Sequence, residues 1–181
     1  MGGINKLSFS MLEMEVESSD YLLIDHGFVK DIKEYARELY NLYEEEDFDE
    51  LPFPKNNIAG MFLYFKRNNI KECNIFYLRD TPLRDIHRRA HEEMHVLHIS
   101  GNLGLLQKKF NDKKLDINVM ECEDFYSCTL GTMDLIANLG SLYALDIKGE
   151  DLSTVTLKSC PGYLKRAMVI YQKALSLRDW N

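Results

Sequence analysis

The sequence predicts a mostly helical α+β domain organised around one histidine-rich helix. Apolar residues recur at helical spacing in several segments, and two short apolar, aromatic runs between residues 60 and 78 predict a pair of strands before that helix. Four of the five histidines lie between residues 87 and 98. A chain of 181 residues is long enough for one domain with a proper core and short for two. We therefore expect a single domain over residues 1–181.

The first part of the chain gives an uneven signal. Apolar and polar residues alternate in residues 1–27 but change phase, which fits either a strand with a bulge or a poorly formed helix. Residues 28–46 predict an amphipathic helix, because its apolar side chains fall on one face. These side chains are Ile32, Tyr35, Ala36, Leu39, Tyr40 and Tyr43. Pro52 and Pro54 must lie outside the helix, since proline removes a backbone donor and restricts the residue before it.

A β-hairpin is predicted next. Residues 60–65 are apolar and aromatic, residues 73–78 form a second apolar run, and residues 66–69 between them form a polar turn. The hairpin leads directly into the histidine-rich helix. We expect it to lie beside that helix, where it would offer a strand edge to an extended peptide.

The central helix is predicted between Thr81 and Gly101. Thr81 supplies a capping hydroxyl, Pro82 fits the first helical position, and Ser100-Gly101 supplies a stop. One stripe of this helix is apolar and would face a core. It consists of Leu83, Ile86, Ala90, Met94 and Leu97. The histidines share an adjacent stripe at about 100° per residue, with Glu92 near its edge.

This helix carries the pattern H-E-x-x-H at residues 91–95. On a helix, this spacing places the imidazoles of His91 and His95 one turn apart on the same face, with the carboxylate of Glu92 beside them. Such a pair can hold one Zn²⁺, and the glutamate can take a proton from the water that the metal activates. The pattern is short, so a histidine-rich, half-buried helix without a metal is the alternative.

Two further regions of the chain are predicted to be helical. Residues 118–145 have apolar side chains at helical spacing, and Gly131 would divide this long region into two helices. Pro161 opens a last helix over about residues 161–178.

A catalytic zinc site needs a third protein ligand and one position left for water. In many H-E-x-x-H enzymes a glutamate on a later helix is that ligand. Glu121 is the best candidate here, because it lies 26 residues after His95, at the start of the later helical region. Glu123 and Asp124 are rivals, and acidic residues that suit the helix dipole are the alternative explanation of all three.

Two further histidines lie one turn from the pair. His98 would be a donor to the oxyanion, a group that supports the metal ligands, or a capped surface histidine, and His87 has the same interpretations. The longer pattern H-E-x-x-H-x-x-G-x-x-H is excluded, since His98 and Gly101 stand where it requires glycine and histidine. A metal site at Cys122 and Cys128 would leave the histidines unexplained.

Three features follow one another along the chain. They are the Gly-aromatic hairpin, the run Ala90-His91-Glu92-Glu93-Met94-His95, and Glu121 followed four residues later by Phe125. Over about residues 28–130, this order resembles the ImmA/IrrE metallopeptidase family. The resemblance implies a zincin-like core over about residues 28–146.

The resemblance also implies a function. His91, His95 and Glu121 would hold Zn²⁺ and Glu92 would be the general base of a zinc-dependent endopeptidase. Members of the family are typically cytoplasmic, and the substrate would be a protein or peptide. The resemblance points to a helix-turn-helix transcriptional repressor or another regulatory protein.

Departures from the family pattern favour a second hypothesis. Met94 stands where the family usually has a small residue, and Cys122, Glu123 and Tyr126 replace small and amide residues of the segment after the glutamate. The alternative is a catalytically degenerate, zincin-like module that regulates or binds a protein partner. A third hypothesis is a zinc held for stability alone by a closed shell of four ligands, completed by His98 or Cys122.

The composition sets further limits. A net charge of −7 argues against sequence-independent binding of nucleic acid, which needs a basic face. No apolar run approaches the roughly 20 residues that cross a bilayer. Residues 1–20 lack the pattern of a secretory signal, and the four cysteines form no C-x-x-C pair. We therefore expect reduced thiols and a cytoplasmic protein without a membrane partner.

Overall fold

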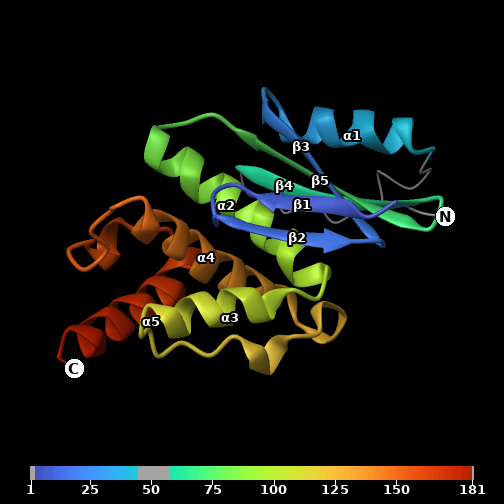
Figure 1. Ribbon diagram of the computed structural model, residues 1–181. Coiled ribbons are helices and arrows are strands. Elements are labelled where there is room, and N and C mark those ends of the chain that lie inside the picture. Colours follow the sequence, from blue (N-terminus) through green and yellow to red (C-terminus); the bar gives the residue numbers. More distant parts are fainter. Residues whose placement is uncertain (1–2, 45–57, 181) are drawn as a thin grey trace.

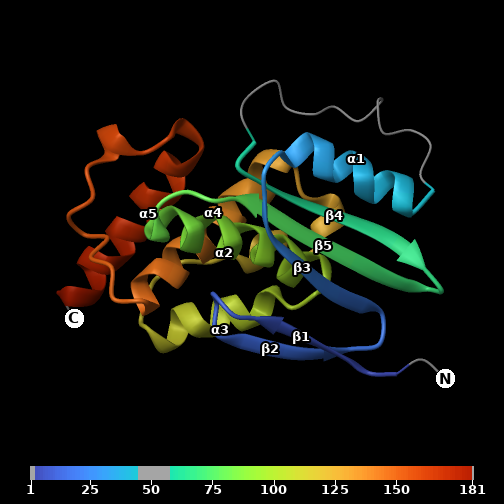
Figure 2. The ribbon, with the colours of Figure 1, turned by 90° about the horizontal axis from the view of Figure 1, so that it is seen from above.

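The structure is a computed structural model that describes residues 3–44 and 58–180. Two small sheets lie on one side of helix α2 (Pro82–Ile99), and three further helices lie on its other side (Figures 1 and 2). These are α3 (Leu103–Asp112), α4 (Leu130–Ile147) and α5 (Gly162–Asp179). The prediction of a mostly helical α+β protein is confirmed in the described residues. None of the helices there is both long and apolar enough to cross a membrane.

The first sheet is formed by β1 (Asn5–Phe9) and β2 (Met14–Ser18), which pair antiparallel. The start of the chain therefore forms strands. Of the two structures that fitted its alternating pattern, the poorly formed helix is wrong. The alternating side chains Leu7 and Phe9 are fully buried, which explains the extended conformation. The turn between the strands is held by Glu93 of α2, whose carboxylate accepts hydrogen bonds from Ser10 Oγ at 3.1 Å and from the Met11 N–H at 3.0 Å.

The second sheet has the order β3-β5-β4. The predicted hairpin is confirmed as β4 (Gly60–Arg67) and β5 (Ile70–Leu78), which pair antiparallel. The turn consists of Asn68 and Asn69 alone and is shorter than predicted. Both residues adopt positive φ, at 51° and 65°, as a two-residue type I′ hairpin turn requires. β3 (Tyr21–Val29) runs parallel to β5.

Helix α1 (Ile32–Leu42) packs on the face of this sheet opposite to α2, and buries Ile32, Ala36 and Leu39 in a small core. It begins after Asp31, whose side chain accepts a hydrogen bond from the Glu34 N–H at 2.8 Å. The helix is shorter than predicted. The predicted end at residue 46 and the link through Pro52 and Pro54 lie outside the described residues.

Helix α2 has the predicted ends. The Thr81 hydroxyl accepts from the Arg84 N–H, Pro82 occupies the first turn, and Gly101 adopts a φ of 75° just beyond the last turn. α5 likewise follows Pro161 as predicted. The main core of the protein lies between α2, α3, α4, α5 and the first sheet.

The predicted helix over the first part of residues 118–145 is wrong. This segment forms two short 3₁₀ turns, η2 (Met120–Cys122) and η3 (Phe125–Ser127), and α4 begins only at Leu130. Asp124 accepts from the Tyr126 N–H at 3.3 Å, and Thr129 caps α4 by accepting from the Thr132 N–H at 3.2 Å. Gly131 is therefore in the first turn of α4 and divides no helix.

Candidate metal centre

Two histidines of α2 and one aspartate of α4 converge. Nε2 of His91 and Nε2 of His95 each lie 3.7 Å from Oδ1 of Asp134. The three ligand atoms lie within 4.8 Å of one another, and no other group of three or more histidine, cysteine or acidic residues in residues 3–44 and 58–180 meets this condition. The two imidazoles that the sequence predicts are therefore brought together with a carboxylate.

The close packing of α2 on α4 positions these side chains. His91 and His95 are one turn apart, and Asp134 follows the Thr129 cap by five residues, so it projects from the start of α4. The histidine side chains are only 16% and 13% exposed, whereas that of Asp134 is 57% exposed. The group is therefore enclosed by protein on the histidine side and reachable from solvent on the aspartate side.

Asn138 fixes the orientation of His91. Its Oδ1 lies 3.3 Å from His91 Nδ1, and its Nδ2 donates to the Tyr163 carbonyl oxygen, also at 3.3 Å. Because the amide oxygen can only accept, Nδ1 of His91 carries the proton and Nε2 presents its lone pair toward Asp134. This arrangement is the usual support of a histidine that binds a metal.

The two histidines differ in their affinity for protons. Burial, and then the charge of His91, lowers the pKa of His95 to about 3. Burial disfavours the charged form of His91, but the carboxylates of Asp134 and Glu92 stabilise that form and raise the pKa of His91 overall. Because the pKa is raised for His91 and lowered for His95, a single proton at this site would be on His91.

The ring of Phe62 on β4 stacks against His95 at 5.8 Å between centroids.

Glu92 is a buried carboxyl group next to the pair. Its side chain is only 6% exposed, and this burial raises its pKa to about 7. It lies against the backbone of β4: a Cβ added at Gly60 would come within 2.6 Å of Glu92 Oε1. Gly60 is thus the residue that leaves room for this carboxylate.

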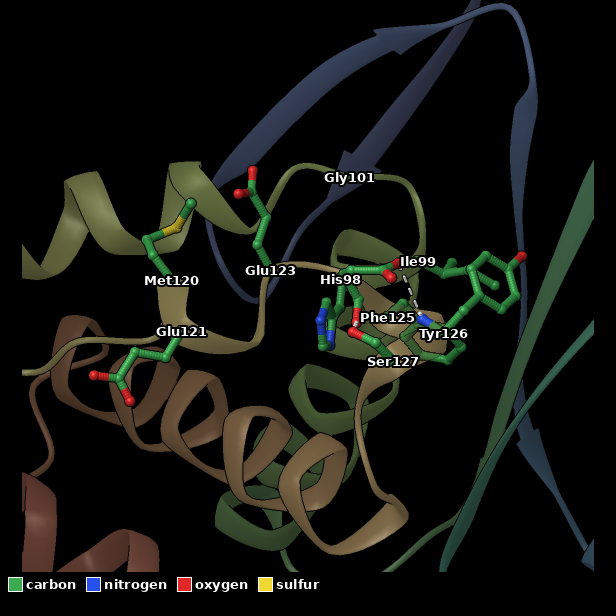
Figure 3. A pocket seen from close by; sticks show the side chains of 10 residues that line it. His98, Ile99, Gly101, Met120, Glu121, Glu123, Phe125, Tyr126 and Ser127 are labelled. Atoms are coloured by element: carbon green, nitrogen blue, oxygen red, sulfur yellow. Dashed lines mark hydrogen bonds between the residues drawn. The ribbon is translucent and has the colours of Figure 1, made fainter.

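The structure does not bring Glu121 into the group with His91 and His95. Glu121 lies in η2, and with Glu123 and Asp124 it lines a separate pocket next to His98 (Figure 3). The physical reason is the late start of α4: the segment that carries the three acids is not the helix that packs on α2. The signal for Asp134 was present in the sequence, because it is the only carboxylate in the first four turns of an otherwise apolar helix.

Three further polar side chains of α2 lie outside the group of ligand atoms. Glu93 is 1% exposed and binds the β1–β2 turn, as described above. His98 is buried and its Nε2 lies 2.7 Å from the Cys122 carbonyl oxygen, so it is not a surface histidine. Nε2 of His87 is buried without a hydrogen-bond partner, and its ring lies 6.2 Å from that of His91.

Comparison with known proteins gives no match: no family model, no curated protein and no solved structure is significantly similar to this chain. The resemblance to ImmA/IrrE metallopeptidases and the zincin-like core therefore stay predictions.

Proposed function

We propose that this protein is a zinc-dependent endopeptidase in which His91, His95 and Asp134 hold the metal. The observation that carries the proposal is the convergence of these three ligand atoms from two helices, with the buried carboxyl group of Glu92 beside them. Asp134 takes the place that the sequence pattern suggested for Glu121.

The donor set fits zinc. Two imidazole nitrogens and one carboxylate oxygen form the three-ligand set of catalytic zinc sites, which leave a fourth position open. His95 is neutral at pH 7, and Asn138 holds His91 in the tautomer that a metal needs. When bound, zinc would supply an activated water whose pKa falls from 15.7 to about 7.

Glu92 would be the general base. It follows His91 directly on α2, and burial gives it a pKa of about 7, which suits a group that takes and returns a proton near neutral pH. Glu92 would accept a proton from the attacking water and pass it to the leaving amine. The exposed side of the group, next to Asp134, is where water and substrate would enter.

Strand β4 would hold the peptide. It is an outer strand of its sheet in the described residues, and its Gly60 and Phe62 contact Glu92 and His95. An extended peptide that paired with the free edge of β4 would pass beside the metal group. What supports a helix-turn-helix repressor or another regulatory protein as the substrate is the resemblance to ImmA/IrrE peptidases alone.

The experiment combines metal analysis with a cleavage assay. Protein purified without chelator should contain about one zinc per chain and should cut members of a proteome-derived peptide library, with the products read by mass spectrometry. Glu92→Gln should keep the zinc and abolish cleavage, and His91→Ala should lose both. Glu150→Gln, an exposed acid beyond α4, is the matched control and should change neither.

Retained cleavage by Glu92→Gln would rule out this mechanism. Unmodified protein without zinc, or with zinc and no cleavage of any library member or candidate repressor, would favour the non-hydrolytic regulatory module.

A further inference from the structure

Tyrosine hydroxyls surround one lysine at the end of the second sheet, next to the β4–β5 turn. Nζ of Lys71 on β5 donates to the hydroxyl oxygen of Tyr126 at 2.6 Å and to that of Tyr21 at 3.3 Å. The same nitrogen lies 4.9 Å and 5.2 Å from the centroids of these two rings. In Figure 3 the Tyr126 ring points away from Glu121 and Glu123, so it belongs to the sheet side of its loop.

This group of side chains has donors to spare. An ammonium has three N–H donors, and the two tyrosines use two of those of Lys71. A phenol that accepts from Lys71 can still donate its own hydrogen, and Tyr126 is 57% exposed. The hydrogen bond to Tyr126 raises the pKa of Lys71, although burial opposes this effect, so the ammonium is charged at neutral pH.

A second lysine faces Lys71 across the hairpin. Lys66 of β4 pairs directly with Lys71 in the antiparallel register, so both side chains project from the same face of the sheet. Like charges directly opposite each other destabilise a sheet. Neither lysine belongs to an ion pair within residues 3–44 and 58–180. An anion between the two side chains would therefore be favourable.

The two lysines share a face of the sheet with the candidate metal centre. Every second side chain of β4 points to this face, so Tyr64 and Lys66 follow Phe62, which stacks on His95. Lys66 is four residues beyond Phe62, which is about 13 Å along an extended strand. A peptide that paired with the free edge of β4 would therefore place one residue beside Phe62 and another, four positions away, beside Lys66.

We propose that Lys66, Lys71 and Tyr126 form a site that binds a carboxylate of a peptide. A carboxylate accepts hydrogen bonds from ammonium and hydroxyl groups, and its charge offsets that of the two lysines. An acidic side chain and the C-terminus of a peptide both supply this group. Binding at the site does not depend on zinc. Its use as a subsite for the substrate, however, rests on the proposed function.

The test of binding uses the full chain after treatment with a chelator, so that zinc plays no part. The probes are three acetylated peptides of alternating valine and threonine. One contains a glutamate and ends in an amide, one has glutamine in place of that glutamate, and one has glutamine and a free C-terminal carboxylate. NMR follows the Nζ resonances of Lys66 and Lys71 and the ring resonances of Tyr126.

A peptide with a carboxylate should cause saturable shifts of these resonances and bind at least about threefold more tightly than the neutral peptide. The peptide that does so shows whether the side chain or the C-terminus is the source. Equal binding of all three peptides, or shifts confined to other residues, would overturn the proposal.

Lys66→Gln/Lys71→Gln should remove the preference for a carboxylate. Lys66→Gln alone should reduce it and leaves the contact between Lys71 and Tyr126 in place. The matched control is Lys108→Gln/Lys158→Gln, which removes two exposed positive charges outside the site and should keep the preference. An unchanged preference in the first variant, or an equal loss in the control, would contradict a specific site.

A cleavage assay then separates the two proposals. If the zinc-loaded protein cuts peptides, a preference for substrates with a carboxylate a few residues from the cleaved bond should disappear in Lys66→Gln/Lys71→Gln. Carboxylate binding without any cleavage would leave the site standing and contradict the peptidase. Cleavage without a preference for a carboxylate would do the reverse.

Discussion

Met94 of α2 lies against Gly140 of α4 so closely that a Cβ at position 140 would come within 2.2 Å of Met94 Cγ. In the ImmA/IrrE pattern the small residue is expected at position 94, whereas here the small residue is on the opposite helix. The glycine lets α4 approach α2 despite the long methionine side chain, and this approach brings Asp134 to the histidines. Met94 therefore does not by itself argue against an intact metal site.

Gly140→Ala should destabilise the protein by about 1–3 kcal/mol, because the new methyl group overlaps a buried side chain that can move only by distorting the core. Urea unfolding of the variant measures this loss. Met94→Ala in the same chain should relieve the overlap, so the double variant should be more stable than the sum of the two single changes predicts. Additive losses would contradict this account of the contact.

Asn138→Leu should weaken zinc binding by about 10- to 100-fold, because it removes the hydrogen bond that orients His91 and fixes its tautomer. Competition with a chromophoric chelator gives the affinity. Ser141→Ala is a suitable control, since Ser141 is also buried on α4 but bonds only its own helix, at the Ala137 carbonyl oxygen. Circular dichroism checks that Asn138→Leu is folded. An unchanged zinc affinity in the folded variant would show that Asn138 does not position His91.

Acid should destabilise the metal-free protein through His87. Burial, and then the charge of His91, lowers the pKa of His87 to about 4, while the unfolded chain has its ordinary value of 6.5. Between these values the unfolded state binds the extra proton, so stability is lost as the pH falls from about 6.5 to about 4. The loss is at most about 3 kcal/mol, because part of the ring remains accessible.

Urea unfolding of chelator-treated protein at pH 7 and pH 4.5 measures this dependence. His87→Leu has no titrating group at this position, so its stability should fall less between the two pH values than that of the unmodified protein. An identical fall in both proteins would mean that His87 titrates normally in the folded state.

The elements with local signals could be predicted from the sequence. Thr81, Pro82 and Gly101 specify the ends of α2 through contacts within a few residues, and Asn68-Asn69 specifies the hairpin turn in the same way. β3 gave no comparable signal: it pairs in parallel with β5, which lies about 50 residues later, and its centre contains the polar residues Asp25 and His26.

Within the candidate site, too, only the part that depends on local sequence could be predicted. The spacing of His91 and His95 is a property of one helix, so the sequence alone places the two imidazoles together. The third ligand depends on where another helix starts and how it packs. The acids at residues 121–124 lie in irregular 3₁₀ turns, and a glycine opposite Met94 brings Asp134 close instead. The sequence marks Asp134 as the only carboxylate in the first four turns of its helix, but a contact over about 40 residues has no local pattern that would show which helix packs on the histidines.

The central claim is that one zinc ion is held by His91, His95 and Asp134. The most direct measurement is an anomalous difference map at the zinc edge from crystals of protein purified without chelator. We expect one peak about 2.0–2.2 Å from Nε2 of both histidines and from a carboxylate oxygen of Asp134. A map without a peak between these three side chains, or with a peak that Glu121 coordinates in place of Asp134, would contradict the account.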